Sequence, residues 1–193
     1  KELCLIPEEV LGFITSTQPK EWEKLEQQYG ESTLSKVLRR ISDEIGKRGI
    51  VDVLRNGVKD RGANLRLIYF QPNSGLNKEH EELYQLNRLS LVRQLRYSTK
   101  NENSIDLVLF VNGLPVVTME LKNQLTGQTY KDSEKQYKMD RDPAESLLRF
   151  KRCAVHFCVD NDNVSMTTQL MGDKTRFLPY NKEIENPVNY LGY

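Results

Sequence analysis

One stretch of the sequence restricts the possible folds more than any other. Residues 104–111 and 116–122 are two mainly apolar runs, and Asn112-Gly113-Leu114-Pro115 separates them. Asn-Gly is typical of the tight turn of a β-hairpin, because both residues tolerate the positive φ angles that such a turn needs. The stretch therefore predicts two antiparallel strands that are neighbours in a sheet.

The register of this hairpin decides which polar side chains meet. If residues 112–114 form a three-residue loop, Asp106 faces Glu120 across the two strands. A two-residue loop offsets the two acids by one position, and the sequence leaves both alignments open. Side chains alternate along a strand, which places Glu120 and Lys122 on one face of theirs. We expect the opposite face to hold Leu107, Leu109, Val117, Met119 and Leu121.

The three charged residues of the hairpin suggest a chemistry. Two carboxylates on neighbouring strands repel each other unless a cation lies between them. Mg²⁺ prefers oxygen ligands and keeps water molecules that can attack a phosphorus atom, and an ammonium group can stabilise the charge that develops on a phosphate. Asp106, Glu120 and Lys122 therefore predict metal-assisted phosphodiester hydrolysis. The alternative is a solvated strand end, where Glu120 and Lys122 form an ordinary surface ion pair.

The rest of the 193-residue chain predicts one α/β domain. We expect a helical N-terminal segment over residues 1–49, a core over 50–180 and a loop-like tail over 181–193. Apolar periodicity and turn residues predict helices over 7–17, 21–29, 32–46, 78–86 and 129–140, and strands over 51–54, 65–70, 89–97, 105–111, 116–122, 153–159 and 164–170.

Composition excludes several classes of protein. A hydrophobic content of 38% suffices for a core and argues against disorder. With 28 basic and 27 acidic residues the net charge is +1, so any contact with DNA must come from a local patch. No segment approaches the roughly 18–20 apolar residues of a membrane span, and no signal segment opens the chain. Because the first residue is Lys1 and not Met, we expect that residues precede it.

Other common sites find no support in the sequence. Cys4, Cys153 and Cys158 form no CxxC pair and have no histidine at ligand spacing, which argues against zinc and fits free thiols in a reducing cytoplasm. The chain has no G-x-x-x-x-G-K-[ST] motif for the phosphates of ATP. No serine or cysteine can be placed beside a histidine base, so a covalent acyl intermediate is not expected.

The hairpin and its flanks resemble a known family. Asp106 followed by Glu120-Leu121-Lys122 resembles the PD-(D/E)xK nuclease signature. Longer runs resemble the N-terminal nuclease region of the restriction (R, or HsdR) subunit of type I restriction-modification enzymes. These runs are 54–60, 83–88, 93–97, 103–106, 112–115, 120–123, 127–129, 136–137, 141–143 and 176–181, so the likeness covers nearly the whole chain.

The resemblance implies a fold and a site. The fold is a restriction-endonuclease-like core, with a mixed, mainly antiparallel sheet flanked by helices. Asp106 and Glu120 are implied ligands of Mg²⁺, the carbonyl group of Leu121 completes the metal site, and Lys122 is the catalytic lysine. Many relatives add a glutamine from the next helix in a Gln-x-x-x-Tyr pattern. Gln136 matches this glutamine, whereas Asp140 stands where the tyrosine is expected.

The resemblance also implies a biological setting. The reaction is Mg²⁺-dependent cleavage of double-stranded DNA in defence against foreign DNA, in the cytoplasm of a bacterium or archaeon. Helicase-like domains of the same R subunit consume the ATP, which this chain does not bind. Methyltransferase and specificity subunits complete the enzyme, and the specificity subunit chooses the DNA sequence.

Two groups of basic residues are candidates for contacts with DNA phosphates. The first group lies on and just after the helix predicted beyond the hairpin: Lys131, Lys135, Lys138 and Arg141. The second precedes the strand of Asp106: Arg88, Arg93, Arg96 and Lys100. Solvated charged faces are the alternative for both groups. Two alternative functions also stay open: a DNA-docking or subunit-interface module with a decayed site, and an RNA nuclease of the same superfamily.

Overall fold

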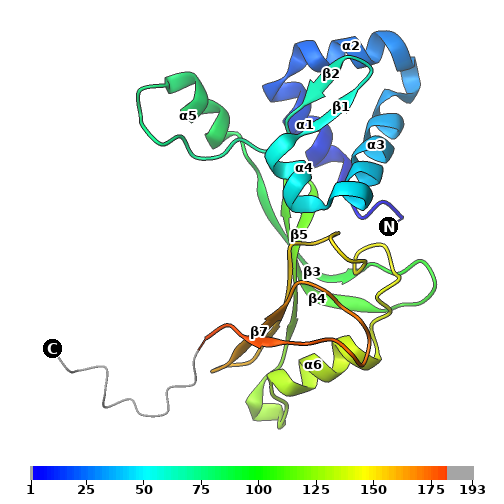
Figure 1. Cartoon of the computed structure of the whole chain (residues 1–193), viewed down its shortest axis with the longest axis vertical. Helices are drawn as coiled ribbons and strands as arrows, with labels where there is room; N and C mark the ends of the chain where they lie inside the picture. Colours follow the sequence, from blue (N-terminus) through cyan, green and yellow to red (C-terminus); the bar gives the residue numbers. More distant parts are fainter. Residues whose placement is uncertain (1, 182–193) are drawn as a thin grey trace, which may run out of the picture.

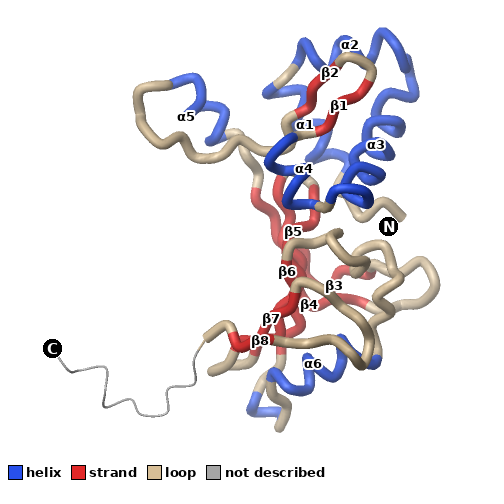
Figure 2. The backbone as a smooth tube through the Cα atoms, viewed as in Figure 1, coloured by secondary structure: helices blue, strands red, loops and turns tan. Residues whose placement is uncertain are grey.

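The computed structural model describes residues 2–181 of the chain. In Figure 1 a helical lobe with a small two-stranded sheet lies above a larger sheet of six strands. Figure 2 shows the larger sheet as a column of strands that begins below this lobe and has helix α6 beside its lower part.

Four helices and one small hairpin form the N-terminal lobe. They are α1 (Pro7–Thr17), α2 (Pro19–Tyr29), α3 (Thr33–Arg48), α4 (Ile50–Asn56), β1 (Val58–Asp60) and β2 (Ala63–Leu65), with the short 3-10 helix η1 (Gly30–Ser32) before α3. Proline begins both α1 and α2, where its missing N–H costs no hydrogen bond. Apolar side chains at helical spacing, such as Val37, Ile41 and Ile45, are buried in one core. The three helices expected before residue 49 are therefore confirmed.

Two predicted strands are wrong in this lobe. Residues 51–54 lie in α4, because Ile50 and Val53 are three residues apart and both face the core, which suits a helix. A short apolar run cannot be assigned to helix or strand by periodicity alone. Of the strand expected over 65–70, only Leu65 lies in a strand, since β2 pairs with β1 over three residues and then ends.

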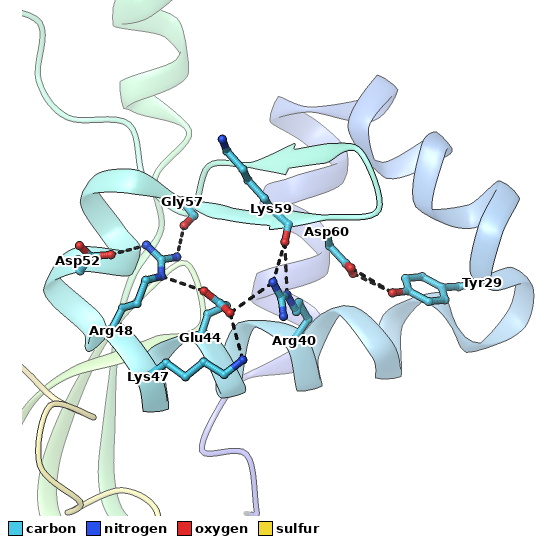
Figure 3. A network of polar contacts seen from close by, with 9 residues as sticks. All are labelled: Tyr29, Arg40, Glu44, Lys47, Arg48, Asp52, Gly57, Lys59 and Asp60. Carbon is cyan, nitrogen blue, oxygen red and sulfur yellow. Dashed lines mark hydrogen bonds and ion pairs between the residues drawn. The ribbon is translucent and has the colours of Figure 1, made fainter.

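A network of charges ties α3 to the elements that follow it (Figure 3). The Glu44 carboxylate accepts a hydrogen bond from Arg48 at 2.8 Å and forms ion pairs with Arg40 and Lys47. Arg48 also pairs with Asp52 of α4 and donates to the carbonyl oxygen of Gly57. Partial burial raises the pKa of Glu44, but the neighbouring cations outweigh it and the pKa is lowered overall.

The larger sheet holds the predicted hairpin. Its strands are β3 (Leu89–Arg96), β4 (Ser104–Val111), β5 (Leu114–Leu121), β6 (Val155–Val159), β7 (Val164–Thr167) and β8 (Leu178–Pro179), in this order across the sheet. All neighbouring pairs are antiparallel except β5 and β6. Helix α5 (Lys78–Gln85) precedes β3, and the 3-10 helix η2 (Gln124–Thr126) and α6 (Tyr130–Met139) connect β5 to β6. The α/β class and the mixed, mainly antiparallel sheet are confirmed, and they are consistent with a restriction-endonuclease-like fold.

The hairpin turn is the shorter of the two loops that the sequence left open. Asn112 and Gly113 have φ angles of +50° and +80° and form a two-residue turn, with Val111 opposite Leu114. The register then shifts by one residue next to Leu109, because Val116 is an extra residue in β5. Leu107 consequently pairs with Met119, the alignment that the longer loop was expected to produce.

The two faces of the hairpin differ in burial. Val108, Phe110, Thr118 and Glu120 share one face and are 0–3% exposed. They belong to or border a second hydrophobic core, to which α6 contributes Tyr137. The opposite face, which holds the leucines expected there, is only half-buried. The acidic pair thus lies on the covered face of the sheet.

The predicted domain limits can be compared with the two cores. Ile50, Val58, Leu65 and Leu67 pack in the same core as α1–α3, so the N-terminal lobe extends past residue 49. The predicted tail lies, after Asn181, outside the described residues. Across residues 2–181, no helix has the length and apolar character of a membrane span.

Candidate active site

Asp106 and Glu120 lie at the open end of the hairpin, away from the turn that contacts the N-terminal lobe. The Asp106 carboxylate accepts a hydrogen bond from the backbone N–H of Leu121 at 2.8 Å, which holds it against the end of β5. Glu120 is fully buried, and the charge of Asp106 is close enough to change its pKa. The structure therefore brings together the two acids that the sequence placed in one site.

Only one oxygen of the Glu120 carboxylate has a hydrogen-bond partner among the described residues. Arg141 donates from Nε to Oε1 at 2.8 Å, and its Nη2 lies 2.8 Å from the same atom. Nη2 also donates to the backbone carbonyl oxygen of Ser104 at 2.9 Å. Oε2 is buried and has no hydrogen-bond partner within residues 2–181. Arg141 thus joins the two strands that carry the acids and leaves one carboxylate oxygen available.

The electrostatics of Glu120 suit a cation. Burial, the negative charge of Asp106 and the hydrogen bond that a protonated Glu120 makes to Asp106 raise the pKa of Glu120 to about 7, although Arg141 opposes the shift. At neutral pH the carboxyl group is therefore close to taking up a proton. A divalent cation between the two acids would favour the ionised form and would give Oε2 a partner.

The ligand set is compatible with a hard metal ion but not with a site made of side chains alone. The described residues contain no group of three or more His, Cys, Asp or Glu side chains placed to hold a metal. Two carboxylates would need backbone oxygen and water to complete the coordination, which Mg²⁺ accepts readily. Asp106, Glu120 and the carbonyl group of Leu121 fit this description.

Lys122 follows directly after the last residue of β5. Its backbone N–H donates to the carbonyl oxygen of Val159 at 2.8 Å, which extends the parallel pairing with β6 by one residue. The side chain is half-buried, and its ammonium forms no hydrogen bond or ion pair with residues 2–181. Alternation along β5 places it on the Glu120 face, with its charge available to a ligand.

Helix α6 packs against the strand of Glu120. Ser133 donates to the backbone carbonyl oxygen of Glu120, and the Tyr137 hydroxyl lies 2.8 Å from that of Thr118. Gln136 is half-buried one turn beyond Ser133, and its Oε1 is buried without a partner in the described chain. Its role in the site stays a prediction.

Tyr137, the residue after Gln136, is the aromatic residue that α6 packs against the strand of Glu120. Tyr137 is fully buried, whereas Asp140, at the expected tyrosine position, is an exposed residue at the end of α6. Thr118 also contacts Nδ1 of the buried His156 at 2.7 Å, so one hydroxyl links α6, β5 and β6. Burial lowers the pKa of His156 to about 4, which leaves the imidazole neutral at pH 7.

The prediction of a phosphate contact is wrong for Arg141, which is buried and pairs with Glu120, whereas the four residues below are on the surface. Lys131 and Lys135 are exposed on α6, and Lys131 lies over the ring of Tyr130. Arg93 and Arg96 are exposed on β3, where Arg96 pairs with Glu102 at 2.7 Å. Their binding to DNA stays a prediction.

The sequence did not indicate the partners of two residues at the site. Arg141 was a candidate phosphate contact, but nothing in the sequence indicated that it is buried and pairs with Glu120. Gln94 of β3 donates to the Asp106 carboxylate at 2.7 Å. No local signal could have found either residue, because both contacts depend on which segments become neighbours in space.

Comparison with protein families identifies the family of the chain. The model of the family described as "Type I restriction enzyme R protein N terminus" matches residues 9–175. The chain belongs to this family. The match begins in α1, spans both lobes and includes Asp106, Glu120 and Lys122. A search of curated proteins finds no match. The chain is therefore the N-terminal region of a type I restriction enzyme R subunit.

Proposed function

We propose that this region is the nuclease of its R subunit and cleaves double-stranded DNA with Mg²⁺ held by Asp106 and Glu120. The supporting observation is the unpartnered Oε2 of Glu120, buried beside a second acid on the next strand. A buried polar atom without a partner costs free energy, and a charged one costs more. A site for a cation explains why the fold tolerates it.

Each residue has a role that follows from its position. When bound, Mg²⁺ would supply a Lewis acid and a water molecule of lowered pKa beside the scissile phosphate. Asp106 and Glu120 would hold it, with the carbonyl group of Leu121 as a further ligand. Lys122 directs its positive charge toward the negative charge that develops on the phosphate. Gln136 would contact the substrate or Lys122 from α6.

The basic residues near the site suit a nuclease whose DNA sequence is selected by another part of the enzyme. Lys131, Lys135, Arg93 and Arg96 would contact phosphates, and such contacts are independent of base sequence. Sequence choice then belongs to the specificity subunit. The methyltransferase subunit and the ATP-driven helicase-like domains of the R subunit are the other proposed partners, in defence against foreign DNA.

Substitutions of the three charged residues in the R subunit test the proposal. In the reconstituted enzyme, we expect Asp106→Asn, Glu120→Gln and Lys122→Ala to abolish DNA cleavage while ATP hydrolysis continues. Glu23→Gln, an exposed acid on α2, is the matched control and should cleave normally. Normal cleavage by Lys122→Ala would show that the site is assigned wrongly.

The same variants separate the alternatives. A docking or interface module with a decayed site predicts no Mn²⁺ binding in calorimetry by the wild-type chain, and variants that change assembly without changing cleavage. An RNA nuclease predicts that matched RNA duplexes are cut in preference to DNA duplexes. We expect Mn²⁺ binding and a preference for DNA.

A further inference from the structure

Gln94 has an unusual backbone conformation for a residue within a strand. Its φ angle is +49°, in the left-handed region, although it lies inside β3. Residues with a Cβ atom rarely adopt this region, because it brings Cβ close to backbone oxygen. Such strain persists where the surrounding structure needs it, and functional sites are common examples.

The side chain of Gln94 lies directly beside Asp106. Arg93 pairs with Leu107 and Leu95 with Ile105, so Gln94 lies opposite Asp106 across β3 and β4. Its Nε2 donates to Oδ1 of Asp106 at 2.7 Å, and its Oε1 accepts a hydrogen bond from Ser104 at 3.0 Å. With the Leu121 N–H on Oδ2, each oxygen of the Asp106 carboxylate has one donor.

A purely structural role does not account for this conformation. Gln94 is exposed, and both of its hydrogen bonds are open to solvent. Such bonds add little to stability, since water can replace either partner. What they determine is the direction of the Asp106 carboxylate.

We propose that Gln94 is a positioning residue of the metal site, whose amide orients Asp106 toward the cation that Asp106 shares with Glu120. This inference rests on the proposed function, because it requires a metal at that place. Neighbours that hydrogen-bond to a metal ligand fix its orientation, and their loss commonly lowers metal affinity by about 10- to 100-fold.

The test compares metal affinity with stability in the full chain. Gln94→Gly removes the amide and also relieves the backbone strain. We expect Mn²⁺ affinity in calorimetry to fall about tenfold, while the melting temperature in EDTA stays the same or rises. A residue that only stabilises the fold would show the reverse, a lower melting temperature and unchanged affinity, and this result would overturn the inference.

A matched control separates strain from positioning. Arg61 is also an exposed residue with a positive φ of +45°, in the turn between β1 and β2, far along the chain from the acids. Arg61→Gly should leave Mn²⁺ affinity unchanged. If the wild-type chain itself binds no Mn²⁺, the proposed function fails and this inference fails with it. If the wild type binds Mn²⁺ and Gln94→Gly binds it equally well, only the inference fails.

Discussion

Arg141 binds only one oxygen of the buried Glu120 carboxylate. Two of its nitrogens lie 2.8 Å from Oε1, whereas Oε2 has no partner in the described part of the chain. The guanidinium therefore balances the charge of Glu120 without enclosing the whole carboxylate. This arrangement keeps an acid ionisable in the interior and leaves one oxygen for a ligand.

Removing Arg141 should destabilise the chain strongly. Arg141→Met leaves Glu120 buried and without its counter-charge, and breaking such a pair costs about 3–5 kcal/mol. Urea unfolding in EDTA at pH 8, where Glu120 of the wild type is mostly ionised, measures this change. The double variant Arg141→Met with Glu120→Gln should recover much of the loss, since no buried charge is left unpaired. A single variant as stable as the wild type would show that the pair contributes nothing.

The raised pKa of Glu120 should make stability depend on pH in the metal-free chain. The native state holds this proton up to about pH 7, whereas the unfolded state releases it near 4.5. The stabilisation that the protonated Glu120 gives the native state is therefore fully present below about pH 4.5, and it is lost as the pH rises through about 7. Melting temperatures in EDTA should show it as a difference: the stability of the wild type relative to Glu120→Gln should be lower at pH 8 than at pH 5.

The buried His156 changes the pH dependence of stability in the opposite direction. Its pKa is lowered from 6.5 to about 4, so its contribution to stability is present above 6.5 and is lost as the pH falls toward 4. The two groups partly cancel between pH 4.5 and 6.5. For this reason the prediction for Glu120 concerns the difference between variant and wild type. A difference that does not change with pH would contradict it.

Gly113 should tolerate no side chain. A Cβ atom there would lie 2.6 Å from the carbonyl oxygen of Ile6 and 2.8 Å from a methyl group of Val10, at a φ of +80°. We expect Gly113→Ala to lower the free energy of unfolding by about 2–4 kcal/mol, from backbone strain and overpacking together. Gly12→Ala in α1 is the control: its Cβ meets nothing within 4 Å, so stability should not fall. Equal losses in both variants would contradict the steric argument.

Lys135 should contribute to DNA affinity without regard to sequence. In Lys135→Glu we expect weaker binding of any duplex by the reconstituted enzyme, with a salt dependence reduced by about 0.9 in log–log slope for each lost phosphate contact. Fluorescence anisotropy at several salt concentrations measures both quantities. Lys36→Glu, on the exposed side of α3, should bind as the wild type does. If both variants weaken binding equally, α6 does not lie along the DNA.

Local patterns in the sequence determined much of this protein. Apolar residues at helical spacing located α1, α2 and α3, and the Asn112-Gly113 pair located the hairpin, because both are properties of neighbouring residues. The same hairpin, with Asp106 and Glu120 on one face, suggested a metal site, and the family-like runs along nearly the whole chain indicated the family.

Other features were decided only by tertiary structure. The extra residue Val116 restored the register of the acids in a way that no turn rule predicts. The run at 51–54 became a helix because its apolar residues met the core of the N-terminal lobe. Arg141 reaches Glu120 across 21 residues of chain, and Gln94 reaches Asp106 from the neighbouring strand. The physical reason is the same in each case: a sequence pattern describes how a segment folds locally, whereas the partner of a buried charge depends on which distant segments pack against it.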